Sequence, residues 1–324
     1  MTIQKLKTYL ENLPAGWVVT GHSAPDADAV ISALFEAYRL TVAGTPAAPV
    51  LQGALPREVA YLLGDLAILL PTTDALDPAV PLVLTDHNDV AAYQNPVMAV
   101  VDHHPVTTEK VPSGIDTEIR PVGAATTLVA FRLRRDGITP DAGCARLLLG
   151  AILLDTENLS PRKAKAEDRE AVAWLAPLCG ADTDALFAAL QAELLSETDV
   201  ATLYRRDYRR YTDPKGQVRL GWAILKVWAD ACPDPDVVRH LLAQDTAPTR
   251  VAKIVQNSRT DGTRTEYYLA AGEEAEALLT LVQSMAGDTA VRTAPDTVFL
   301  PETAAHWGRK RYAVLLNETW RKKS

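Results

Sequence analysis

Residues 16–28 read Gly-Trp-Val-Val-Thr-Gly-His-Ser-Ala-Pro-Asp-Ala-Asp, and this stretch decides the fold of the first half of the chain. The apolar run over residues 16–21 predicts a short buried strand that stops at His22. Apolar residues at helical spacing follow the polar loop and predict a helix that begins near Asp28. A strand, a ligand-bearing loop and a helix in this order are typical of the open edge of a parallel sheet.

Three further apolar runs end abruptly in side chains that can bind metal ions. Residues 81–85 predict a strand that stops at Asp86, residues 96–101 predict one that stops at Asp102, and a long apolar run precedes Asp155. Together with the loop at residues 22–28, these stretches contain four of the six histidines, at His22, His87, His103 and His104. Because parallel strands deliver their carboxyl ends to one edge of a sheet, we expect these side chains to converge on one place.

The alternation of strands and helices defines the first domain. Residues 58–63 and 124–134 have helical patterns between and after the predicted strands. This order predicts an α/β domain with a parallel sheet and right-handed crossovers. The pattern is interrupted by a polar segment at residues 194–199, so we place the boundary there and expect domains at residues 1–193 and 194–324.

The second, smaller domain is also expected to be α/β. Residues 217–228 predict a strand, residues 270–285 predict a helix, and residues 314–316 predict a short final strand. This half has no cluster of histidine and aspartate. It has two basic stretches instead, at residues 204–210 and 308–312.

Composition and charge narrow the range of partners. The formal net charge of −8 argues against a broad polyanion-binding surface, so nucleic acid is not an expected partner. The chain shows no signal peptide and no apolar run of the roughly 18 residues that a membrane span needs, so we expect a cytoplasmic protein with no membrane partner. The three cysteines lie far apart without CxxC spacing, which predicts neither a disulfide framework nor a cysteine zinc site. The oligomeric state stays open, with a homodimer as one option.

The polar loop at residues 22–28 offers three candidate metal ligands, His22, Asp26 and Asp28. A loop can turn all three inward, whereas a regular strand would point alternate side chains to opposite faces. The alternative is that Asp26 or Asp28 only caps the following helix. Asp86 has a similar alternative, because Asp-His-Asn-Asp is also good turn chemistry.

The remaining candidates are harder to explain structurally. A buried structural histidine is the usual alternative for one imidazole, but His103 and His104 are adjacent and directly follow a predicted buried strand. Asp155 follows an apolar segment that would not bury an unpaired charge without cost. A metal ion is the natural partner for such a carboxylate.

The donor set defines the expected chemistry. Carboxylates and imidazoles without thiolates suit manganese, magnesium, iron or cobalt better than structural zinc. The candidates are too many for one ion, and a carboxylate shared by two ions about 3.5–4 Å apart would use them all. Such a pair can hold a hydroxide at neutral pH, which predicts metal-assisted hydrolysis of a phosphoester or phosphoanhydride.

The basic stretches would complete such a site. Fixed cations are needed as charge develops on phosphate oxygens, and arginine suits bidentate phosphate contact. We expect Arg209, Arg309 and Lys310 to bind a small anionic phosphate substrate in a cleft between the domains. The alternative is that they are ordinary solvated surface charges.

Taken together, the four motifs resemble the DHH phosphoesterase superfamily, named for the Asp-His-His triplet seen here at residues 102–104. The second half is similar to the accessory domain called DHHA2. The resemblance points to the manganese-dependent family II inorganic pyrophosphatases and to the prune-type exopolyphosphatases. It implies two or more Mn²⁺ ions, with Mg²⁺ or Co²⁺ as substitutes, and a parallel-sheet catalytic domain beside a smaller α/β domain.

The resemblance also implies roles for individual residues. One ion would be held by His22, Asp26 and Asp86, and the other by Asp28, Asp86, His103 and Asp155, with Asp86 as the bridge. His104 would contact or protonate the phosphate, and Asp102 would support the histidine pair. Arg209, Arg309 and Lys310 would hold the outgoing phosphate.

Two departures from the family pattern concern the substrate. Gly308 stands where the pyrophosphatases carry serine, and Arg209 stands where they carry lysine; the segment at residues 155–161 is closer to the exopolyphosphatases. Pyrophosphate is the leading substrate and polyphosphate its nearest rival. A nanoRNA or cyclic-dinucleotide phosphodiesterase is less favoured, because residues 194–324 lack the glycine-rich Gly-Gly-Gly-His type of motif. A scaffold protein that lost catalysis would require loss of metal ligands, and all are present.

Overall fold

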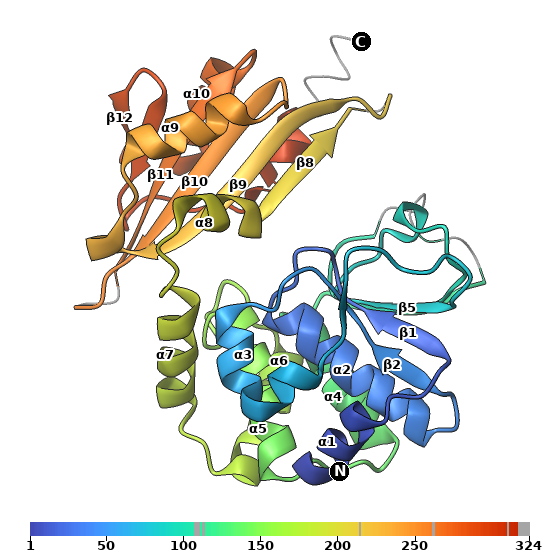
Figure 1. The fold of residues 1–324 in the computed structure, drawn as a ribbon. Helices are drawn as coiled ribbons and strands as arrows, with labels where there is room; N and C mark the ends of the chain where they lie inside the picture. The colour runs from blue at the N-terminus through green and yellow to red at the C-terminus, as the bar shows by residue number, and fades with distance from the viewer. Residues whose placement is uncertain (107–110, 112–113, 214, 261–262, 310, 317–324) are drawn as a thin grey trace. The chain divides into compact units, whose positions relative to one another are not determined.

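The computed structural model describes the chain except for residues 107–110, 112–113, 214, 261–262, 310 and 317–324. The chain divides into two compact units, Met1–Leu194 and Leu195–Ser324 (Figure 1). Among the residues that the structure describes, no helix has the length and apolar character needed to cross a membrane.

The first unit is built on a parallel five-stranded sheet. The strand order is β2-β1-β5-β6-β7, and all neighbouring strands are parallel. The strands are β1 (Trp17–Thr20), β2 (Ala47–Pro49), β5 (Leu82–Thr85), β6 (Val97–Asp102) and β7 (Asp116–Ile119). The three strands expected from sequence, β1, β5 and β6, are confirmed and lie side by side. Their carboxyl ends therefore share one edge of the sheet.

Helices cover one face of this sheet and supply most of the apolar core. They are α1 (Ile3–Glu11), α2 (Ala27–Val42), α3 (Arg57–Leu63), α4 (Ala125–Arg135), α5 (Ala142–Asp155), α6 (Ala166–Cys179) and α7 (Thr183–Leu194). A short parallel pair, β3 (Leu51–Gln52) and β4 (Thr72–Thr73), lies outside the main sheet. The expected helices at residues 28, 58–63 and 124–134 are confirmed as α2, α3 and α4.

The fourth apolar run differs from the other three, because residues 147–154 belong to helix α5 and not to a strand. Residues 147–153 are all buried, so the helix is apolar on every side and shows no amphipathic period. A fully buried helix and a buried strand look alike in such a short run. Asp155 therefore reaches the site from the last turn of a helix.

The second unit contains a mixed six-stranded sheet in the order β12-β13-β11-β10-β9-β8. The strands are β8 (Tyr208–Thr212), β9 (Val218–Trp228), β10 (Thr249–Asn257), β11 (Arg264–Gly272), β12 (Val291–Ala294) and β13 (Thr297–Leu300). Only β9 and β10 are parallel neighbours. The helices are α8 (Val200–Arg206), α9 (Pro235–Gln244) and α10 (Ala275–Ala286).

Both faces of this sheet are covered. Trp222 packs in one apolar cluster with α10 residues, and its neighbour Ala223 packs in another with residues of α8 and α9. Successive strand residues point to opposite faces, so the two clusters lie on opposite sides of the sheet. The expected strand at residues 217–228 is confirmed as β9.

Two expectations for this unit need correction. Residues 270–272 end strand β11, so the helix expected at residues 270–285 begins only at Ala275. The strand expected at residues 314–316 is wrong, because residues 311–316 are helical. Tyr312 and Leu316 are buried while Val314 between them is exposed, which is the spacing of one helix face. A three-residue apolar run was too short to distinguish the two structures.

Candidate metal centre

The loop after β1 places the first three candidate ligands. Asp26 is the N-cap of α2, and its Oδ1 accepts a hydrogen bond from Ala29 N at 3.0 Å. The capping alternative therefore holds for Asp26, but it uses one oxygen only. The other oxygen, Oδ2, lies 3.7 Å from Nε2 of His22. Capping and metal binding are thus compatible at this residue.

Asp28 points from the first turn of α2 toward the N-terminus of α4. It is 1% exposed, and its carboxylate accepts hydrogen bonds from the backbone N of Ala125 (2.6 Å) and Thr126 (2.7 Å). The amide groups at a helix N-terminus favour a negative charge there. They hold the Asp28 side chain in a fixed position.

Asp86 lies at the centre of the candidate ligands. It directly follows β5, is 2% exposed and has a backbone φ of 59°, in the left-handed region. Its Oδ2 lies 3.3 Å from Nε2 of His22, and its Oδ1 lies 3.1 Å from Nε2 of His103. One carboxylate oxygen thus faces each histidine, which is the arrangement of a bridging ligand. Strained backbone of this kind is found more often at functional sites.

His103 gathers the second group of ligands. Its Nε2 lies 3.8 Å from Oδ2 of Asp28 and 3.6 Å from Oδ2 of Asp155. Its Nδ1 lies 3.1 Å from the carbonyl oxygen of Val122, so Nδ1 carries a hydrogen and Nε2 faces the carboxylates. A histidine that donates one N–H to a carbonyl presents the other nitrogen to a metal ion.

The chemistry of this donor set fits divalent cations. Ligand atoms of His22, Asp26 and Asp86 lie within 4.8 Å of one another, as do those of Asp28, His103 and Asp155. Within the described part of the chain, the buried Oδ1 of Asp86 makes no hydrogen bond. Four carboxylates around two imidazoles need added positive charge, which metal ions or protons can supply.

The pKa shifts express this surplus of negative charge. Burial alone would lower the pKa of His22, but hydrogen bonds to Asp26 and Asp86 and their charges outweigh it and raise the pKa to about 10. Asp86 has the same effect on His103, whose pKa rises well above its usual value despite burial. Burial and the neighbouring charges of Asp86 and Asp155 raise the pKa of Asp28. Protons take the place of cations when no metal is bound.

A second set of contacts orients His104. The buried Asp102 accepts a hydrogen bond from His103 N at 2.8 Å, and the same oxygen lies 2.9 Å from Nδ1 of His104. Its other oxygen accepts from Nδ2 of Asn88 at 2.6 Å. Asn88 was not identified from sequence, although its place two residues after Asp86 in the same turn was the available signal. Asp102 thus orients the histidine pair from behind.

A further network that sequence reasoning missed lies behind Asp86. Nδ1 of His87 lies 3.0 Å from the carbonyl oxygen of Thr85, and Nε2 lies 2.8 Å from the hydroxyl of Tyr93. The Tyr93 oxygen accepts a hydrogen bond from Nε2 of Gln52 at 2.8 Å. Burial lowers the pKa of His87, which favours the neutral ring. His87 therefore supports the turn that carries Asp86, in contrast to the candidate ligands His22 and His103.

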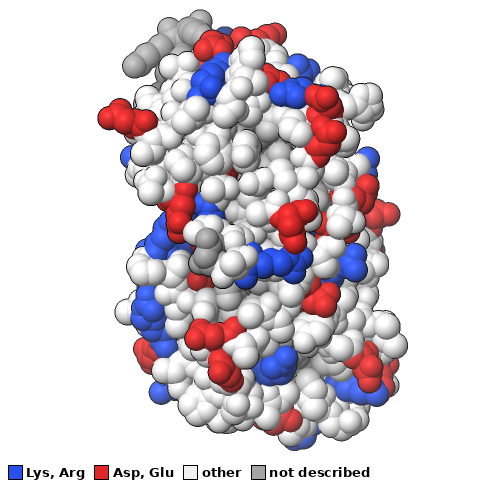
Figure 2. Space-filling model, turned by 90° about the vertical axis from the view of Figure 1, so that its left-hand side faces the viewer, with Lys and Arg blue, Asp and Glu red and all other residues white. Residues whose placement is uncertain are grey.

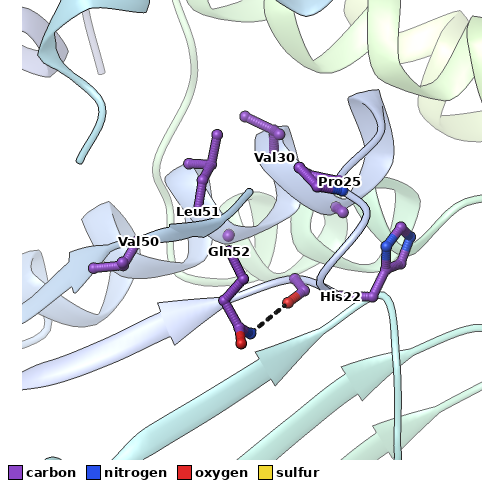
Figure 3. A pocket seen from close by; sticks show the side chains of 9 residues that line it. His22, Pro25, Val30, Val50, Leu51 and Gln52 are labelled. Atoms are coloured by element: carbon purple, nitrogen blue, oxygen red, sulfur yellow. Dashed lines mark hydrogen bonds between the residues drawn. The ribbon is translucent and has the colours of Figure 1, made fainter. Parts of the chain in front are cut away.

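Gln52 connects this network to the first loop. Its amide nitrogen also lies 3.3 Å from the carbonyl oxygen of Gly21, the residue before His22. Figure 3 shows the Gln52 side chain directed at the backbone that leads to His22, in a small pocket that Pro25 and Val30 also line. Gln52 therefore contacts both the backbone before His22 and, through Tyr93, the network behind Asp86.

The segment after α5 adds a cation beside Asp155. Nζ of Lys163 donates to the backbone oxygen of Asp155 at 2.8 Å and lies 3.5 Å from its carboxylate. Between them, Glu157, Asn158 and Leu159 have φ values of 51°, 54° and 58°. Consecutive left-handed residues other than glycine are rare. Sequence reasoning identified neither the lysine nor this backbone conformation.

The substrate-binding candidates lie in the second unit. Arg209 is on β8, and its Nη1 donates to the backbone oxygen of Tyr208. Arg309 begins the helical segment near the C-terminus, and its guanidinium pairs with Oδ1 of Asp207 at 2.6 Å. Lys310 lies outside the described residues. Their roles in phosphate binding stay predictions.

Comparison with known proteins adds three findings. No family model matches the chain. It is 34% identical over 200 residues to a protein of Deinococcus radiodurans named "probable manganese-dependent inorganic pyrophosphatase", which covers 59% of this chain and 64% of that one. It is 30% identical over 172 residues to a manganese-dependent inorganic pyrophosphatase of Methanothrix thermoacetophila, covering 51% and 55%.

The fold comparison extends over most of the chain. A crystal structure from Methanococcus jannaschii, assigned provisionally to the family II inorganic pyrophosphatases, matches with a TM-score of 0.70. The match covers 91% of this chain and 96% of that one at 20% identity. The chain resembles the family II pyrophosphatases. The resemblance and the two-part α/β fold expected from the motifs are thereby confirmed. The sequence matches span less than two thirds of the length of these curated pyrophosphatases.

Proposed function

We propose that the chain is a manganese-dependent hydrolase that cleaves the phosphoanhydride bond of inorganic pyrophosphate. The position of Asp86 is the observation that carries this proposal. Its two oxygens face His22 and His103 at 3.3 Å and 3.1 Å, and each histidine faces further carboxylates. The names of the sequence relatives support manganese and pyrophosphate.

Two or more ions would occupy this site. One would be held by His22, Asp26 and Asp86, and the other by Asp28, Asp86, His103 and Asp155. Bound ions would supply a hydroxide at neutral pH and neutralise phosphate charge. Oxygen and imidazole donors suit Mn²⁺, and Mg²⁺ or Co²⁺ are the expected substitutes.

The chain's own residues would orient and protonate the substrate. Asp102 holds Nδ1 of His104, which leaves Nε2 to contact a phosphate oxygen or to give it a proton. Arg209, Arg309 and Lys310 would bind the phosphate that leaves. The guanidinium of Arg309 now pairs with Asp207, and a phosphate would compete with that carboxylate.

A small anionic phosphate compound is the proposed partner, and we do not propose nucleic acid or membrane binding. Figure 2 shows basic and acidic side chains interspersed on the face in view, without one broad basic surface. The formal net charge of −8 supports the same choice. The cytoplasmic location and a homodimer stay predictions.

Polyphosphate is the second candidate substrate, and Gly308 favours it. The serine that the pyrophosphatases carry at this position would offer a hydroxyl contact that glycine lacks. The test is phosphate release by the manganese-loaded protein from pyrophosphate, tripolyphosphate and long polyphosphate in parallel. Turnover of pyrophosphate alone supports the main proposal, preference for longer chains replaces it with exopolyphosphatase activity, and no release from any of them rejects both.

A further inference from the structure

A buried ionic cluster in the second unit has no part in the chemistry described so far. Glu266 on β11 is 0% exposed, and Lys253 on β10 is 3% exposed. Nζ of Lys253 lies 2.7 Å from Oε1 of Glu266. The pair lies on the sheet face where Tyr268 and Tyr312 pack.

Other groups complete the cluster around Glu266. Arg264 contributes Nη2 at 2.8 Å from Oε1, and the hydroxyl of Tyr268 donates to Oε2 at 2.8 Å. Nδ1 of His306 lies 3.1 Å from Oε2. Replacing a buried ion pair with packed apolar side chains is often neutral or stabilising, so stability alone is a weak reason for this arrangement.

The cluster reaches the segment that carries Arg309. Nζ of Lys253 donates to the backbone oxygen of Trp307 at 3.2 Å, and the neighbouring His306 contacts Glu266. The indole of Trp307 donates to the backbone oxygen of Met285 at 2.9 Å. The two residues before Gly308 are therefore tied to the sheet and to α10.

Gly308 itself supplies no such restraint. A Cβ at this position would meet no heavy atom within 4 Å, so no packed side chain restrains this residue on that side. Glycine also has the least restricted backbone of any residue. Arg309 is therefore held from both sides, by the anchors at His306 and Trp307 before it and by the buried Tyr312 after it.

We propose that Lys253 and Glu266 are positioning residues that fix the backbone leading to Arg309. The inference rests on the proposed function, because Arg309 is a proposed phosphate ligand. The cluster holds the backbone, while Asp207 holds the guanidinium and is the contact that a phosphate would replace. With its backbone fixed, Arg309 would exchange Asp207 for phosphate without moving its Cα.

The first test is hydrogen–deuterium exchange in the full-length protein. Lys253→Met should speed exchange in peptides that cover residues 304–309, while Lys253→Arg should restore protection. Arg239→Met is the control, because Arg239 on α9 pairs with Asp296 and touches none of the cluster residues. Unchanged exchange in a folded Lys253→Met variant would overturn the proposal. Should that variant not fold, Glu266→Gln takes its place with the same expected result.

The second test is a double-mutant cycle on the active protein. Lys253→Met should raise the KM for pyrophosphate by about 10- to 100-fold, the cost of a misplaced contact, with bound manganese unchanged. In an Arg309→Ala/Lys310→Ala background the same change should have no further effect, because Lys253 acts only through the segment that carries these two residues. Additive losses would refute the proposal. If the wild-type protein releases no phosphate, the proposed function fails and the exchange experiment still decides the anchoring.

Discussion

Oδ1 of Asp86 lies 3.1 Å from Nε2 of His103. Because Nδ1 of His103 carries the hydrogen that it donates to the carbonyl oxygen of Val122, the lone pairs of Nε2 and of Oδ1 face each other. A proton or a metal ion must lie at this point for the arrangement to be stable. The left-handed backbone of Asp86 brings its carboxylate there.

Asp86→Asn should remove the shared ligand and keep the fold. Asparagine tolerates the left-handed backbone, so the turn should form as before. We expect at most one manganese ion per chain by elemental analysis. Activity should fall by at least about 100-fold, which is the upper limit for the loss of a residue that only supports a metal ligand. Asp116→Asn, at an exposed position on β7, is the control. Normal turnover with full metal content would rule out a bridging role.

Tyr93→Phe should weaken metal binding without touching a ligand. The change removes the hydroxyl that joins His87 to Gln52 and so loosens the turn at Asp86. We expect manganese affinity to fall by about tenfold and the free energy of unfolding by about 1 kcal/mol. Titration calorimetry and urea unfolding measure the two effects. Tyr61→Phe, at a half-exposed site on α3, should change neither, and equal affinities for wild type and Tyr93→Phe would contradict the supporting role.

Gly308→Ser should fold normally and shift substrate preference toward pyrophosphate. The structure has open space for the new Cβ, so the melting temperature should stay within about 2 °C of wild type. The added hydroxyl can contact phosphate. Gly221→Ser is the contrasting variant, because its Cβ would lie 2.4 Å from the Tyr208 hydroxyl and should destabilise the fold. An unchanged ratio of pyrophosphate to polyphosphate turnover would remove Gly308 as a specificity determinant.

Glu266 should make the second unit sensitive to acid. Burial alone would raise its pKa, but His306, Lys253 and Arg264 outweigh burial and hold it well below the usual 4.5. A lowered carboxyl pKa contributes stability above pH 4.5 that is lost as pH falls further. The difference in unfolding free energy between wild type and Glu266→Gln should therefore shrink below pH 4.5. Urea unfolding from pH 3 to 7 measures it, and a constant difference would show that the carboxylate charge does not matter.

The sequence predicted the sheet edge well, because three buried parallel strands are continuous apolar runs that stop at a polar residue. Their shared edge then brought His22, Asp86 and His103 together without further information. Helix α5 was not distinguished from a strand, since a helix that is buried on all sides has no polar face to reveal its period.

The supporting residues could not be predicted from the sequence, for a different reason. Gln52 and Tyr93 are 41 residues apart and carry no local pattern; only the packing of two loops makes them partners. Lys253 and Glu266 lie on β10 and β11, two strands that were not predicted from the sequence. Tertiary contacts of this kind become visible only in the folded structure.

Because Glu157–Leu159 have left-handed backbone, the rate of trypsin cleavage near this segment should depend on whether an ion is bound at Asp155. Each such residue costs about 1–2 kcal/mol, so the segment keeps its shape only while its contacts hold it. An ion at Asp155 would hold one end, and its removal by a chelator should let the backbone relax and expose the peptide bonds after Arg162 and Lys163. Cleavage there should be faster in chelator than in excess manganese, and equal rates would mean that the fold restrains this segment without help from a metal.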